Sequence, residues 1–76
     1  MLNLNERGVE GRTHLMQACA RGDLSVVRFL LERGASPHIR DDSGLTAVEI
    51  AHARGHVEIA ALVARWIVGD FSEKSE

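Results

Sequence analysis

The chain reads Gly11-Arg12-Thr13-His14-Leu15-Met16-Gln17-Ala18 and, 33 residues later, Gly44-Leu45-Thr46-Ala47-Val48-Glu49-Ile50-Ala51. The same offset relates Arg21-Gly22 to Arg54-Gly55 and Leu30 to Val63. Glycine, small and apolar positions all stay in step, which is typical of one supersecondary unit used twice. We therefore expect a short solenoid, with function on a repeated surface rather than in a cleft.

The first unit has the sequence pattern of two helices joined by a turn. Thr13 is placed to cap a short helix over 14–21, and Gly22 permits a tight reversal after it. A longer helix from residue 23 or 24 to Arg33 carries one apolar stripe and ends at Gly34. The polar, turn-rich residues 38–43 that follow predict a projecting hairpin loop.

The second unit repeats this pattern with two differences. Thr46 and Glu49 form a capping box, which the first unit lacks because Met16 stands where glutamate would be. The second short helix is expected to end at Arg54, and the last helix to run from near Val57 to about Val68, where Gly69 stops it. Because this last helix lacks the Gly-Ala stop of the first unit, we expect it to carry apolar side chains to the C-terminal end of the stack.

Both units resemble the ankyrin repeat. The resemblance covers roughly residues 7–68 and implies an all-α, ankyrin-like solenoid of two helix-turn-helix repeats joined by a projecting hairpin loop. We divide the chain into a lead-in (1–6), a first repeat (7–39), a second, terminal repeat (40–69) and a disordered tail (70–76). The residues that carry the resemblance are Gly11, Thr13, Leu15, Ala18, Gly22, Asp23, Leu24, Val26, Val27, Leu30, Leu31, Gly34 and Ala35, and then Asp41, Gly44, Thr46, Ala51, Gly55, His56 and Val63.

Composition narrows the classes of partner and compartment. A chain of 76 residues holds one small domain, and its single cysteine, Cys19, excludes an internal disulfide framework and suits a reducing compartment. No signal peptide or membrane span is evident, so we expect a cytoplasmic protein without a membrane partner. A net charge of −2 gives no general attraction to phosphate backbones, so nucleic acid is not an expected partner.

The resemblance implies that a protein partner binds the hairpin tips and the concave side of the short helices. Four arginines fall into step there: Arg7 with Arg40, and Arg21 with Arg54. Guanidinium groups at these places could hold a carboxylate-bearing segment through bidentate contacts. The alternative is that they are solvated helix-end residues that complement the helix dipole. The expected partner-binding residues are Arg7, Val9, Arg21, Arg40, Asp42, Ser43, Leu45 and Arg54, with Glu10 beside them.

A second candidate contact is the C-terminal apolar patch, defined as Leu62, Trp66, Ile67 and Phe71. Tryptophan is enriched in binding hot spots, and a contiguous apolar patch on a small domain usually marks a contact site. The patch predicts either a homodimer or docking to another protein. In the alternative reading, Phe71 and the turn at Gly69 fold back and cover the patch.

Catalytic and metal sites are not expected. Cys19 could pair with His14 or His52 as nucleophile and base, but its position predicts a small buried side chain, and a buried thiol is ordinarily inert. His52 and His56 are separated by Gly55, so they do not share one helix face for a metal ion. No cofactor motif is present. His38 is expected to bond the hairpin backbone. The sequence thus predicts a non-catalytic protein-interaction module, or alternatively a self-assembling structural unit.

Overall fold

The computed structural model describes residues 4–69. Within them the chain forms a short 3-10 turn, η1 (Val9–Gly11), and the helices α1 (His14–Arg21), α2 (Leu24–Glu32), α3 (Ala47–Ala53) and α4 (Val57–Val68). These bounds agree with the sequence prediction to within a residue, except that η1 was not anticipated. The described part of the chain contains no strand. The fold is therefore an all-α repeat fold, as predicted.

Side-chain caps explain where three of the helices begin. Met16 N–H donates to Thr13 Oγ1 at 3.3 Å, and Val26 N–H donates to Asp23 Oδ1 at 3.4 Å. At α3 the predicted capping box is confirmed, because Thr46 N–H donates to Glu49 Oε1 at 2.9 Å and Glu49 N–H donates back to Thr46 Oγ1. Each bond satisfies a backbone donor that the first turn leaves unpaired.

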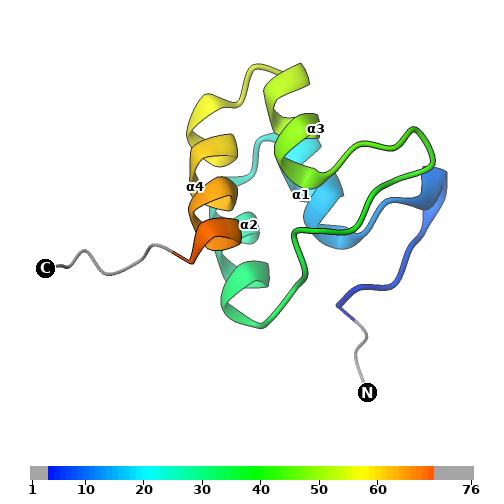
Figure 1. Ribbon diagram of the computed structural model, residues 1–76, viewed down its shortest axis with the longest axis horizontal. Coiled ribbons are helices and arrows are strands. Elements are labelled where there is room, and N and C mark those ends of the chain that lie inside the picture. The colour runs from blue at the N-terminus through cyan, green and yellow to red at the C-terminus, as the bar shows by residue number, and fades with distance from the viewer. Residues whose placement is uncertain (1–3, 70–76) are drawn as a thin grey trace, which may run out of the picture.

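The two repeats stack in parallel layers. The short helix α1 packs on α3, and the longer α2 packs on α4. Figure 1 shows α3 and α4 lying in front of α1 and α2, with both hairpin loops at one edge and the helix–helix turns away from them. One hydrophobic core fills the space between the layers and between the repeats. Its largest fully buried side chains are Leu15, Met16, Leu31, Ile50, Val27 and Val63.

The hairpin loops are built the same way in both repeats. Gly8 N–H donates to the Arg12 carbonyl at 2.8 Å, and the equivalent bond runs from Asp41 N–H to the Leu45 carbonyl at 2.9 Å. A further bond, from Asp42 N–H to the Glu10 carbonyl at 3.0 Å, joins one loop to the next. The loops therefore form one continuous edge to which both repeats contribute.

The last helix ends where expected, since Gly69 adopts φ 80° and caps α4. The proposed tail, residues 70–76, lies outside the described residues. None of the helices within residues 4–69 is both long and apolar enough to cross a bilayer.

Candidate partner-binding surface

Asp41 organises the second hairpin loop from inside. Its side chain is only 1% exposed, and its carboxylate accepts hydrogen bonds from Ser43 N–H at 2.8 Å, Leu45 N–H at 2.9 Å and Arg12 Nε at 3.3 Å. The Leu45 N–H, followed by Arg12 and the Ser43 N–H, lowers the pKa of Asp41 below its usual value, against the opposing effect of burial. An ionised Asp41 thus fixes the loop and ties it to Arg12 of the first repeat.

The pair Arg7 and Arg40 has a structural role in this loop edge. Arg7 Nε donates to the Gly11 carbonyl at 3.0 Å, and Arg7 Nη2 donates to the Arg40 carbonyl at 2.9 Å. Arg40 Nη1 donates to the Gly44 carbonyl at 2.8 Å, which repeats the first bond 33 residues later. Since both guanidinium groups bind their own loops, they have less freedom to reach a partner.

Arg21 and Arg54 form the second pair, and their situation differs. Arg21 is the last residue of α1, and Arg54 follows α3 as its C-cap. Both side chains are exposed, and neither forms a hydrogen bond or an ion pair within residues 4–69. These two guanidinium groups lie at the same place in successive repeats with their donors available.

Most of the remaining predicted partner-binding residues lie at the tips of the hairpin loops, and one packs against the hydrophobic core. Val9 is 78% exposed, the Asp42 side chain is 71% exposed, and Ser43 and Glu10 are also exposed at the loop tips. Asp42 Oδ1 lies 3.7 Å from Arg7 Nη2, so the structure brings these two predicted residues together as an ion pair. Leu45 instead packs half-buried against the hydrophobic core.

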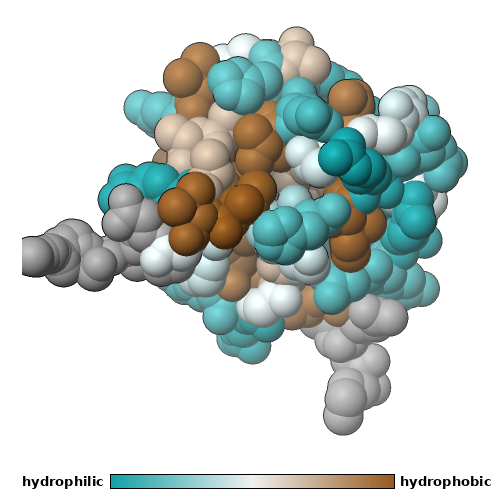
Figure 2. All heavy atoms as spheres, in the orientation of Figure 1, coloured by the Kyte–Doolittle hydropathy of each residue, from teal (hydrophilic) through white to brown (hydrophobic). Residues whose placement is uncertain are grey.

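The C-terminal apolar patch is only partly an open surface. Leu62 and Trp66 pack against the hydrophobic core, whereas Ile67 is 39% exposed and its neighbour Val68 is 75% exposed. Figure 2 shows apolar atoms gathered over the last turns of α4. Phe71 lies outside the described residues. The accessible part of this patch is therefore the end of α4.

The candidate thiol is buried. Cys19 is 0% exposed, and burial raises the pKa of its thiol from 9.0 to about 12, so the thiolate that a nucleophile needs does not form near neutral pH. No group of three potential metal ligands occurs among residues 4–69. The expectation that the His38 side chain bonds the hairpin backbone is wrong, because its imidazole is exposed and forms no hydrogen bond within residues 4–69. Only its backbone N–H bonds locally, to Ser36 Oγ at 3.3 Å.

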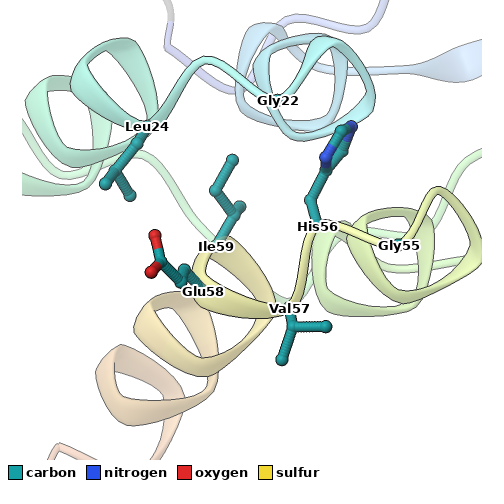
Figure 3. Close-up of a pocket in the computed structure, with 7 residues that line it drawn as sticks. All are labelled: Gly22, Leu24, Gly55, His56, Val57, Glu58 and Ile59. Carbon is teal, nitrogen blue, oxygen red and sulfur yellow. The ribbon is translucent and has the colours of Figure 1, made fainter.

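His56 is a structural residue that the sequence did not reveal. Its repeat equivalent, Asp23, caps α2, but His56 makes no such cap at α4. Its Nε2 instead lies 3.3 Å from the Ala20 carbonyl, and its ring covers Gly22. Figure 3 shows the ring directed toward Gly22. Both residues line a depression of about 330 Å³ between the two helix–helix turns. The exchange of Asp for His at a cap position was the available signal.

Comparisons with known proteins agree with the geometry. The family profile described as "Ankyrin repeats (many copies)" matches residues 2–51. Ankyrin repeat domain-containing protein 46 of Danio rerio is 54% identical over 44 residues, covering 58% of this chain and 19% of that protein. The ankyrin repeat protein YahD of Escherichia coli K12 is 40% identical over 67 residues, covering 82% of this chain and 33% of that protein.

A similar segment also occurs beside an enzyme. The NAD-capped RNA hydrolase NUDT12 of Macaca fascicularis is 43% identical over 61 residues, covering 80% of this chain and 13% of that protein. The chain thus spans a third or less of each of these relatives.

Proposed function

Because the chain belongs to the ankyrin-repeat family, whose repeats generally act as protein–protein interaction modules, we propose that it binds a protein partner without catalysing a reaction. The binding surface consists of the exposed loop tips (Val9, Asp42 and Ser43) and the concave side of α1 and α3. Its free cysteine favours a reducing compartment such as the cytoplasm.

The arginine pairs carry the proposal. Arg7 and Arg40 are occupied by loop carbonyls, but Arg21 and Arg54 are exposed and unpaired within residues 4–69. Two guanidinium groups at equivalent places in adjacent repeats fit a partner segment that carries carboxylates, which arginine can bind in bidentate fashion. The segment would run along the stack and contact both repeats.

The test replaces Arg21 and Arg54 with alanine, singly and together. Each substitution should weaken the binding of a partner purified on the wild-type protein by roughly tenfold or more. A hydrogen bond to a charged group contributes about 1.5–3 kcal/mol, and this free energy corresponds to that loss of affinity. Thermal stability should change little, because both side chains are exposed. Arg28→Ala, an exposed arginine on α2, is the control and should leave affinity unchanged. Unchanged affinity in the double variant would remove these arginines from the site.

A second candidate function is self-association through the C-terminal apolar patch. The exposure of Ile67 and Val68 supports it, because such apolar area is usually covered in a stable complex. If this patch forms a homodimer, Ile67→Glu should convert the dimer to a monomer in sedimentation velocity. A dimer that persists in Ile67→Glu would argue against the patch.

A further inference from the structure

The two ends of the stack can be compared position by position. Residues 33 apart hold the same place in their repeats, so a difference in burial between them shows what the neighbouring repeat covers. Met16 and Cys19 are buried, whereas their equivalents Glu49 and His52 are exposed. That side of α1 is therefore covered by the second repeat, and the same side of α3 is uncovered.

The opposite side of the inner helices, α1 and α3, shows the reverse pattern of burial. Ala47 and Ile50 are buried against the first repeat, whereas their equivalents are the exposed His14 and the half-buried Gln17. Both uncovered sides of the inner helices are thus polar. The sequence-based expectation of an apolar C-terminal end concerned the last helix, α4. Helix α3 is polar at this end, because Glu49 and His52 stand where the first repeat has Met16 and Cys19.

The outer helices are α2 and α4. Their uncovered sides, at the two ends of the stack, are apolar. On the first repeat, Phe29 is 50% exposed and Val26 is half-buried, whereas the equivalent of Val26, Ile59, is only 4% exposed. On the second repeat, Ala64 is half-buried, whereas its equivalent Leu31 is only 2% exposed. Val57 is 65% exposed, and its equivalent Leu24 is 38% exposed. We define the leading face as His14, Gln17, Val26, Phe29 and Leu30, and the trailing face as Glu49, His52, Val57 and Ala64.

The leading face is hollowed. A depression of about 250 Å³ lies over its polar half, lined by residues that include Arg12, His14 and Gln17. A second depression, of about 400 Å³, lies over its apolar half and is lined by Leu4 of the lead-in, His14 and Arg21 of α1, and Val26, Phe29 and Leu30 of α2. The two adjoin at His14. The leading face is therefore polar over the inner helix and apolar over the outer helix, which is also the arrangement of the trailing face.

We infer that the leading face of one copy of this chain docks on the trailing face of a second copy, in the register that the two repeats use within the chain. In that register Phe29 occupies the place of Leu62, and Ala64 occupies the place of Leu31. The leading face thus carries a larger residue than the internal interface does, and the trailing face a smaller one. Exchanges that conserve volume are the ones that packed interfaces tolerate best.

The polar halves are complementary in the same register. Glu49 takes the place of Met16 and would face His14 and Gln17, both of which carry N–H donors. Glu49 Oε1 already accepts from Thr46 N–H, so its other oxygen would accept from the second copy. A carboxylate opposite N–H donors fixes register and disfavours other alignments.

Pairing of like ends fits less well. Two trailing faces in a two-fold dimer would leave Phe29 of both copies uncovered, and two leading faces would leave Val57 uncovered. Contact between unlike faces covers one Phe29 and one Val57 in each interface. It is heterologous, so each dimer keeps one free face of each kind and can cover these as further copies add. This inference is drawn from the ends of the stack. Arg21 lines the apolar depression and also belongs to the arginine surface proposed above, so the test leaves both Arg21 and Arg54 unchanged.

The test uses sedimentation velocity of the full chain and two blocked variants. Phe29→Glu places a charge on the leading face, and Ala64→Glu places one on the trailing face. We expect the mass of wild type to rise with concentration above the 8.3 kDa of one chain, and each variant alone to remain monomeric. An equimolar mixture should form one-to-one dimers and nothing larger, because each variant keeps the face that the other lacks.

Ser25→Glu and Ala61→Glu are the matched controls. They add the same charge to the same helices, at positions that are exposed in both repeats, and should assemble as wild type does. If Ala64→Glu fails to fold by circular dichroism, Val57→Glu replaces it. A monomeric wild type, a mixture that stays monomeric, or a Phe29→Glu variant that still dimerises would each overturn the inference. Variants of Arg21 and Arg54 are not used, so failure here leaves the partner proposal standing.

Discussion

At the residue scale, the contribution of the second hairpin loop to stability depends on whether Asp41 is ionised. Its folded pKa lies below the value of about 3.9 in an unfolded chain. Its contribution to stability is therefore fully present above that pH and is lost as the pH falls through the lower folded pKa. The carboxylate must be ionised to hold Arg12 and the two backbone donors together.

Asp41→Asn should lower the stability at neutral pH and flatten the acid limb of the stability profile below about pH 4. Urea denaturation over a pH series measures both effects. Asp42→Asn is the control, because the Asp42 side chain is 71% exposed and should behave nearly as wild type does. An acid limb that is equally steep in Asp41→Asn and wild type would contradict the role of Asp41.

Gly22 is required for two reasons that can be separated. Gly22 and Gly55 both adopt positive φ, 78° and 80°, so alanine at either position should cost about 1–2 kcal/mol. An added Cβ at Gly22 would also lie 2.7 Å from Cε1 of His56, whereas nothing lies within 4 Å at Gly55. Urea denaturation should show a larger loss for Gly22→Ala than for Gly55→Ala. The excess should disappear in a His56→Ala background, and its persistence there would exclude the contact as its cause.

At the scale of the elements, the sequence predicted the helices well because their ends are set locally. Thr13, Asp23 and Thr46 cap the helices that follow them, and Gly22 and Gly69 end the helices that precede them. Apolar spacing then identified the buried stripe. The glycines at 8 and 11 indicate a turn there, but not the 3-10 form of η1, because Glu10, with φ 60°, adopts a conformation that its residue type does not signal.

Helix α1 packs on α2 and α3, and Cys19 is one of its four buried residues, so the reactivity of this thiol reports on the opening of α1. A thiol-specific reagent should label Cys19 only as fast as the domain unfolds, so labelling should accelerate with urea in step with unfolding. The raised pKa of about 12 also means that stability is lost as the pH rises above 9.0, because only the unfolded chain ionises there. Cys19→Ala should remove that loss. Rapid labelling in the native state would show that α1 opens independently.

At the scale of the whole molecule, periodicity placed Arg7, Arg21, Arg40 and Arg54 on a shared surface but could not say which were occupied. Arg7 reaches the carbonyl of Arg40, which depends on the stacking of the two repeats. The sequence also did not predict that the uncovered sides of α1 and α3 are polar. This becomes visible only when the burial of equivalent positions in the two repeats is compared. Stacking geometry, unlike helix formation, is not encoded in any single local stretch.

We propose that a protein partner binds the loop edge and the short helices α1 and α3 rather than the longer helices α2 and α4. The most direct test is photocrosslinking in the cell that makes the protein, with p-benzoylphenylalanine in place of Ser43 on the loop or Ser25 on α2, both of which are exposed. We expect a defined covalent adduct with a second protein from position 43 and none from position 25. An adduct from position 25 alone, or the same adduct from both positions, would contradict it.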